Sequence, residues 1–301
     1  MKSNPQFIIG VSGSGKTFSI NQSVLKLNQK GKRTIVLVSE FSAEHKPTCK
    51  VTNGEYEDLS LSKQKINIMD FVKQEEGKTN VNILYAFFEA VAKRELSKIE
   101  KEDITSAARD TFGMKRNSSP MLRDFLEAMK EYPALKEVSD KLELMFEDSR
   151  CQFFNGDTNV TFPSLHTVLS IDNFPIKYRI AALLTVINYL ALWVKNNPDT
   201  HIFLDSGIMS MGSQNTLCFI AQKIKEISEY SKISVTMASL ENFHGVWDGI
   251  FGQEWELQLM AVLPPEKEMI EKLFNIKISP ETFALVNKFE RGEYVNISSN
   301  D

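Results

Sequence analysis

The chain has 301 residues, of which 42% are hydrophobic and 25% charged, values typical of one soluble globular domain or of one domain with an insertion. Its 35 basic and 39 acidic residues leave a net charge of −4, so global charge gives no reason to expect binding to nucleic acid or an anionic membrane. Its three widely spaced cysteines exclude a CxxC zinc site and a disulfide framework, and they indicate reduced thiols in a cytosolic protein.

The first third of the chain has the pattern of an α/β domain. We expect a short apolar strand at Gln6–Ile9, a helix at Lys16–Gln29 ended by Gly31, and a fully buried strand at Thr34–Val38. The polar stretch 39–61 is interpreted as a loop or small hairpin, and residues 66–69 as a short strand.

Helical periodicity dominates residues 80–159. Apolar residues recur on one stripe from Ile83 to Val91, and Ser119-Pro120 and Pro133 mark the starts of two further helices. We therefore predict an all-helical insertion at 80–159 within an α/β domain formed by residues 1–79 and 160–301.

Strands and helices alternate again after residue 165. The apolar stretch 180–194 is interrupted by Thr185 and Asn188 and is shorter than the ~20 residues that span a bilayer, so we expect a buried helix there. The alternation predicts a mainly parallel sheet with helices on both faces. Strands are expected at 165–171, 201–204, 233–237, 257–262 and 293–297, with helices at 175–195 and 213–230 and from Pro265 and Pro280.

A phosphate-binding loop follows the first expected strand. The run from Gly10 to Thr17 fits G-x-x-x-x-G-K-[ST], and it stands between a strand and a helix, as this motif requires. Glycines let backbone N–H groups turn inward around phosphate oxygens, and the helix start adds its positive dipole end. Lys16 is expected to reach the β- and γ-phosphates and Thr17 to ligate Mg²⁺. The expected nucleotide-binding residues are Gly10, Ser12, Gly13, Ser14, Gly15, Lys16, Thr17 and Phe18.

A phosphate loop of this kind needs a carboxylate at the end of a neighbouring strand to hold Mg²⁺. Two aspartates qualify, namely Asp205 after the apolar strand 201–204 and Asp172 after 168–171, although either could be a simple turn residue. We favour Asp205, as both a catalytic residue and a metal ligand. The next residue is Ser206, and a serine hydroxyl is a poor base near neutral pH, which counts against fast hydrolysis.

The order of motifs resembles the ATPase domain of the fourth VirB component of type IV secretion systems, a family grouped with the HerA–FtsK ring motors. The resemblance extends from about Asn4 to Ser298 and implies a RecA-like P-loop NTPase fold. It rests on NPQFIIGVSGSGKT, TIVLVSEFSAEH, KINIMDF, MLRDFLEAM, CQFFNGDTNV, LHTVLSIDNFP, IFLDSGIMSM and KFERGEYVNIS.

Several positions depart from the family pattern. The acidic pair on the Walker B strand is Asp205-Ser206 here, and the family's Thr-Gln falls at Thr236-Met237-Ala238, which contains no glutamine. The basic cluster usually found before that strand is thin, reading KEISEYSK. Ser39 stands at a family Asp position, whereas Glu44 stands at the family's acidic position and is a candidate catalytic carboxylate or a solvated loop residue.

The resemblance implies a cytoplasmic protein, at the cytoplasmic face of the membrane, that binds ATP or ADP with Mg²⁺. It also implies secretion partners and self-assembly into a ring, expected to be a hexamer, while net charge gives no support for nucleic acid as a partner. Membrane association is expected only through partners. The family's N-terminal portion lacks a counterpart, so we expect an isolated C-terminal domain or a short stand-alone relative.

Three functions compete at this point. A motor ATPase that energises substrate or DNA transfer leads, followed by a nucleotide-binding scaffold with little turnover. A small-molecule kinase ranks last because the arginines of the insertion do not cluster. Arg291, near a glycine turn, could contact nucleotide, reach a neighbouring subunit as an arginine finger, or be a surface arginine. The four histidines lack metal-ligand spacing, so we expect structural roles for them.

Overall fold

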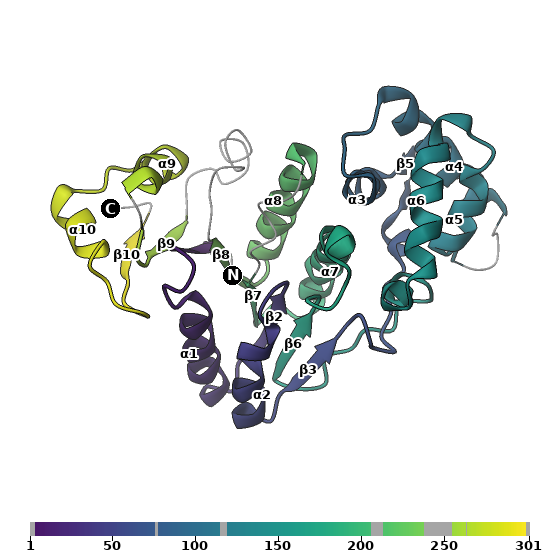
Figure 1. The fold of residues 1–301 in the computed structure, drawn as a ribbon. Coiled ribbons are helices and arrows are strands. Elements are labelled where there is room, and N and C mark those ends of the chain that lie inside the picture. Colours follow the sequence, from purple (N-terminus) through teal and green to yellow (C-terminus); the bar gives the residue numbers. More distant parts are fainter. Residues whose placement is uncertain are drawn as a thin grey trace. The chain divides into compact units, whose positions relative to one another are not determined.

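The computed structural model describes residues 4–75, 78–114, 119–205, 213–237, 255–262 and 264–298 (Figure 1). These residues form two compact units. The first contains the described residues up to Glu57, Phe162–Asp172 and those from Leu190 onward, and the second contains Asp58–Thr161 and Asn173–Tyr189.

An eight-stranded sheet is built in the order β10-β9-β1-β8-β7-β2-β6-β3. The neighbouring pairs from β9 to β6 are parallel, and β10 is antiparallel to β9. The predicted fold class, a mainly parallel P-loop-type sheet with helices and a helical insertion, is therefore confirmed. The strands are β1 (Gln6–Ile9), β2 (Arg33–Val38), β3 (Glu55–Asp58), β6 (His166–Ser170), β7 (Thr200–Asp205), β8 (Lys232–Met237), β9 (Glu256–Leu259) and β10 (Val295–Ser298).

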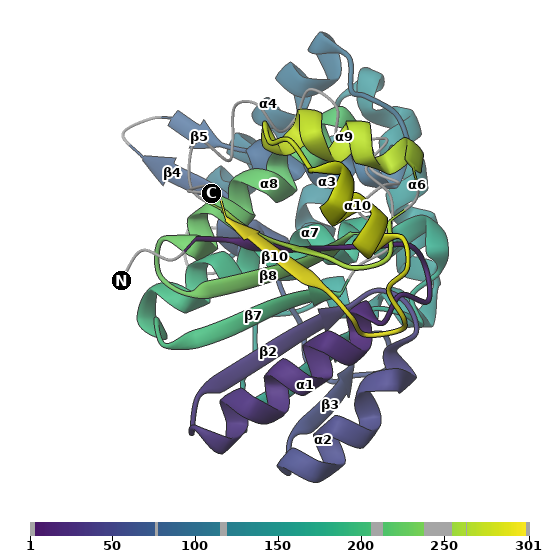
Figure 2. The ribbon, with the colours of Figure 1, turned by 90° about the vertical axis from the view of Figure 1, so that its left-hand side faces the viewer.

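Helices cover both faces of this sheet. The helices α1 (Lys16–Gln29) and α2 (Lys46–Thr52) lie on one face, and α8 (Gln214–Ser228) lies on the other (Figure 2). Near the C-terminal end follow α9 (Pro264–Phe274) and α10 (Pro280–Val286). Phe274 of α9 packs its ring against Phe7 of β1 at a centroid distance of 5.6 Å and against Trp255 at 5.0 Å.

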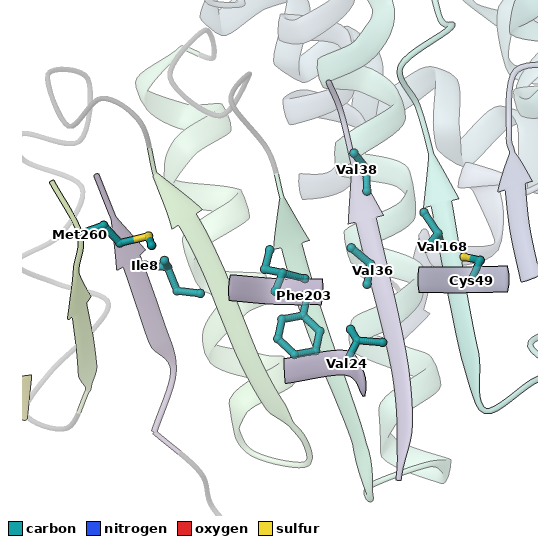
Figure 3. Packing of buried hydrophobic residues seen from close by; sticks show 9 residues of the cluster. Ile8, Val24, Val36, Val38, Cys49, Val168, Phe203 and Met260 are labelled. Carbon is teal, nitrogen blue, oxygen red and sulfur yellow. The ribbon is translucent and has the colours of Figure 1, made fainter. Parts of the chain in front are cut away.

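The core between α1, α2 and the sheet follows from the two-residue period of the strands. On β2, Val36 and Val38 face Val24 of α1 and Cys49 of α2 (Figure 3). By the alternation of a strand, Ile35 and Leu37 lie on the opposite face. Both sets are fully buried, which explains why the β2 sequence is continuously apolar instead of alternating.

The second unit contains a small hairpin and a helical cluster. Its buried rings pack edge-on or stacked, with Phe88 over Phe125 at a centroid distance of 5.6 Å and Phe87 against Phe154 at the same distance. The elements are β4 (Lys73–Glu75), β5 (Lys78–Asn80), α3 (Asn82–Ala92), α4 (Lys98–Met114), α5 (Leu122–Met129), α6 (Lys136–Glu147) and the first part of α7 (Arg179–Trp193).

The expected buried helix after Pro175 is present. The helical stretch Ile176–Asn196 is long and apolar enough to cross a membrane by composition, but 61% of its 18-residue apolar window is buried inside the structure. Tyr189 of this helix donates a hydrogen bond from its hydroxyl to the carbonyl of Val160 at 2.8 Å. These observations fit a core helix.

Three local predictions were wrong. The stretch 39–61 contains the 3-10 helix Ser42–His45 and helix α2, with Pro47 in its first turn, in addition to β3. The expected strand at 66–69 is a 3-10 turn, because Asn67 accepts a hydrogen bond from the Met69 amide through its side chain. The helix expected to start at Ser119-Pro120 begins two residues later, at Leu122, where Asp124 accepts from the Met121 amide.

The surroundings of two histidine rings, the buried His166 and the partly buried His201, favour their neutral form. The Ser234 hydroxyl donates to Gln6 at 2.7 Å, so its oxygen accepts from His201 Nε2 at 2.9 Å, and His201 Nδ1 is buried without a partner among the described residues. Burial lowers the pKa of His201 to about 3 and that of His166 to about 4. Protonation of either ring would place a charge beside apolar neighbours.

Acidification should therefore destabilise the fold through these rings. The unfolded histidine titrates near pH 6.5 and the folded ones well below it, so stabilisation is complete above pH 6.5 and is lost as pH falls toward 4 and 3. Between pH 7 and pH 5, the unfolding free energy of the wild type should fall by about 2 kcal/mol more than that of His201→Gln, which has no imidazole to protonate. Urea titrations at both pH values measure this, and parallel losses in the two proteins would contradict it.

Candidate functional site

The loop after β1 has the shape of an anion cradle. Gly13 and Gly15 adopt left-handed backbone angles, with φ of 83° and 100°, which side chains disfavour. The Gly10 amide donates to the carbonyl of Met237 at 3.3 Å, and the Val11 amide donates to that of Ala261 at 2.9 Å. The loop is thus anchored on both sides, by the last residue of β8 and by the backbone that follows β9.

The start of α1 is open to an anion. Gly15 occupies the N-cap position, so no side chain caps the helix, and the first turn contains no acidic residue. The free N–H groups and the positive end of the helix dipole therefore point at the loop. The predicted helix bounds, Lys16–Gln29, are confirmed.

Lys16 is folded back onto the loop. Its Nζ donates to the carbonyls of Gly10 at 2.7 Å and Val11 at 2.9 Å. Burial lowers the pKa of Lys16, although the charges of Asp205 and Glu266 oppose this. A bound phosphate would offer the ammonium charged acceptors in place of these carbonyls.

Thr17, in the first turn of α1, meets Asp205 at the carboxyl end of β7. The Thr17 hydroxyl donates to Asp205 Oδ2 at 2.8 Å, and the Thr236 hydroxyl donates to Oδ1 at 2.8 Å. Burial raises the pKa of Asp205. The hydrogen bond and charge of His45, together with the hydrogen bonds from Thr236 and Thr17, lower it by more than burial raises it, so the net pKa lies below its usual value. Asp205 is therefore a carboxylate at neutral pH.

The rival Asp172 lies elsewhere. Its Oδ2 accepts from the Ser42 amide at 3.3 Å and the Ser42 hydroxyl at 3.2 Å, and it does not line the pocket beside the phosphate loop. The strand order explains the difference, since only β8 separates β7 from β1, whereas three strands separate β6 from β1.

His45 contacts Asp205 in this site, although we expected only a structural role for it from the sequence. Its ring is fully buried, with Nε2 3.1 Å from Asp205 Oδ2 and Nδ1 2.9 Å from Asn21 Oδ1. The Asn21 amide nitrogen donates to the Glu44 carbonyl at 3.2 Å, so its oxygen faces the ring. Both ring nitrogens therefore face side-chain oxygens, so the ring links the Asp205 carboxylate to Asn21 of α1.

One signal for this network was available in the sequence. Asn21 stands four residues after Thr17 and therefore on the same face of α1. Nothing in the spacing connected His45 with Asp205, because they are 160 residues apart.

A pocket of about 310 Å³ joins these groups. Glu44, the candidate catalytic carboxylate, lines this pocket, and so does Glu40. Phe41 has a left-handed φ of 55° and is 71% exposed, an unusual state for a large apolar residue. The lining residues are Ser12, Gly13, Gly15, Lys16, Thr17, Phe18, Glu40, Phe41, Glu44, Asp205, Thr236 and Arg291.

The donor set fits a nucleotide with Mg²⁺. Hydroxyl and carboxylate oxygens of Thr17 and Asp205 are the hard ligands that Mg²⁺ takes, together with waters and phosphate oxygens. Three carboxylates and two cations line the pocket, so a bare polyphosphate would meet excess negative charge that a divalent cation offsets. Ser206 and Ala238, whose identities departed from the family pattern, lie outside the described residues.

No protein-family model and no curated protein matches the sequence. Among solved structures, VirB4 of Thermoanaerobacter pseudethanolicus is 17% identical, with a TM-score of 0.80 over 99% of this chain and 87% of that one. The bacterial conjugative coupling protein TrwB without its first 70 residues, in complex with sulphate, is 10% identical, with a TM-score of 0.53 over 98% and 77%. Its unbound form is 8% identical, with a TM-score of 0.56 over 97% and 81%. This chain therefore has the fold of VirB4 and, more distantly, of TrwB.

Proposed function

We propose that this protein binds ATP with Mg²⁺ and hydrolyses it, as a motor-type ATPase of a conjugative type IV secretion apparatus. The observation that carries the proposal is the 2.8 Å bond between Thr17 and Asp205 beside the phosphate loop, within the pocket that Lys16 also lines. The likeness to VirB4 and to the conjugative coupling protein TrwB supports the biological setting.

Each residue has a distinct task in this proposal. The loop amides and Lys16 bind the phosphates, while Thr17 and Asp205 would hold Mg²⁺. The metal, when bound, supplies neutralisation of charge that develops on the phosphate oxygens. Asn21 and His45 orient the Asp205 carboxylate. Glu44, or Glu40 beside it, accepts the proton of the attacking water, since both line the pocket.

A nucleotide-binding scaffold of the same apparatus is the second candidate. The residue after Asp205 is Ser206 and not a glutamate, which favours slow turnover. Two pocket carboxylates, Glu40 and Glu44, favour hydrolysis, and for this reason we rank the motor first. As in the resemblance, the setting would be the cytoplasmic face of the membrane, with assembly into a ring and contacts with other secretion components.

The test is ATP turnover by the purified protein with Mg²⁺ and with excess EDTA. We expect phosphate release that needs Mg²⁺ and falls at least roughly tenfold in Lys16→Ala, because no ammonium remains in the cradle. Lys26→Ala is a matched control, since Lys26 lies on the same helix but outside the pocket. Tight ATP binding without measurable release would select the scaffold, and absence of binding would reject both functions.

A further inference from the structure

The chain's C-terminal strand brings a turn against the phosphate loop. β10 pairs antiparallel with β9, with Val295 opposite Leu259, and β9 pairs with β1, which leads into the loop. The segment between α10 and β10 therefore crosses the end of β1. Its Gly292 amide donates to the Ser14 carbonyl at 2.9 Å.

Two glycines permit this approach. A Cβ on Gly15 would lie 2.7 Å from the Gly292 nitrogen and 3.0 Å from its Cα. Gly292 itself has φ of 94°, and a Cβ there would lie 3.3 Å from the ring of Phe18. Backbone-to-backbone contact of this closeness fixes the turn relative to the phosphate loop.

The contact places Arg291 on the pocket wall. Its Cγ would lie 3.3 Å from a Cβ on Gly15, and the residue lines the pocket with Lys16. In the part of the chain that the structure describes, Arg291 forms no ion pair or side-chain hydrogen bond, so its five donors are free for a ligand. Lys16 and Arg291 are the cations among the described lining residues.

The position of Arg291 indicates which phosphates it would contact. Mg²⁺ is expected on the side of Thr17 and Asp205, whereas Arg291 stands at Gly15, where backbone amides cradle the α- and β-phosphates. A guanidinium binds phosphate oxygens in a bidentate manner. ADP and ATP share these two phosphates.

On the basis of the proposed nucleotide site, we propose that Arg291 is a phosphate ligand of the same chain's nucleotide, held by the 290–293 turn. Under this assignment Arg291 is neither a surface arginine without a ligand nor an arginine finger that contacts the nucleotide of a neighbouring copy. The assignment predicts that ADP and ATP lose affinity equally when the guanidinium is removed, because the contact does not involve the γ-phosphate.

The experiment compares the wild type, Arg291→Ala and Arg291→Lys, with binding of ADP and a non-hydrolysable ATP analogue measured by calorimetry in Mg²⁺. Arg291→Ala should weaken both nucleotides by about tenfold or more, and Arg291→Lys by less. Lys288→Ala is the matched control, because it removes an exposed positive charge from the same segment outside the pocket, and it should bind as the wild type does.

The outcomes separate this inference from the proposed function. Wild-type affinity for both nucleotides in Arg291→Ala overturns the inference alone, and a fall in turnover under those conditions would assign Arg291 to a neighbouring copy. Equal losses of nucleotide affinity in Lys288→Ala and Arg291→Ala would show that the effect comes from positive charge in general, and they would also overturn the inference. Absence of nucleotide binding by the wild type overturns both proposals. A melting temperature near that of the wild type would show that Arg291→Ala is folded.

Discussion

Asp205→Asn is expected to reduce Mg²⁺-dependent ATP hydrolysis on the order of 100- to 1000-fold. The amide keeps the size of the carboxylate, and its oxygen still accepts from Thr17 or Thr236, but the negative charge that Mg²⁺ needs is gone. The fully buried His45 ring also loses the carboxylate oxygen that its Nε2 faces at 3.1 Å. Turnover measured across a Mg²⁺ titration should show both a lower maximum and a higher metal requirement.

The matched control is Asp172→Asn. Asp172 also follows a strand of the same sheet and accepts hydrogen bonds from the Ser42 amide and hydroxyl, but it does not line the nucleotide pocket. We expect its Mg²⁺ requirement to equal that of the wild type. If Asp172→Asn raised the requirement and Asp205→Asn did not, the metal ligand would have been assigned to the wrong strand.

Gly15→Ala should abolish nucleotide binding and also weaken the fold. The left-handed φ of 100° disfavours a side chain, and the added Cβ would lie 2.7 Å from the Gly292 nitrogen, so the C-terminal turn must move. We expect a loss of about 1–3 kcal/mol in unfolding free energy and a fall in nucleotide affinity of about 100-fold. Chemical denaturation and calorimetry measure the two effects separately.

Gly31→Ala is the comparison variant, because it introduces backbone strain without a steric clash. Gly31 ends α1 with a φ of 66°, but a Cβ there would meet no atom within 4 Å. Its cost should be about 1 kcal/mol from the backbone alone, with nucleotide affinity unchanged. If the two alanine variants lost equal stability and bound nucleotide equally, the close approach of Gly292 would not constrain the loop.

The sequence predicted the elements whose signals are local. The glycine loop, α1 and the continuously apolar β2 are specified by residues within about 30 positions of one another, and the structure has them where expected. Local turn chemistry was harder to predict. Asn67 converts an apolar stretch into a 3-10 turn through its own side chain, and its amide group also contacts Pro120, 53 residues away.

The rest of the site depends on long-range placement. Asp172 and Asp205 look alike in sequence, and the sheet order places β7 two strands from β1. His45 reaches Asp205 across 160 residues, and Arg291 reaches Gly15 only because β10 pairs with β9. A single sequence contains no record of these pairings, which is why neither the contact of His45 with Asp205 nor the place of Arg291 could be predicted from it.

The pairing of β1 has a consequence for how the protein is made. Both neighbours of this strand come from distant residues, since Gln6 pairs with Ser234 on one side and Glu256 on the other. A ribosome must therefore synthesise more than 250 residues before the first strand has both partners. Such non-local pairing slows folding, and until then β1 exposes unpaired backbone. The phosphate loop is synthesised well before β8 and β9, so it would become competent to bind its ligand only after both strands have been made.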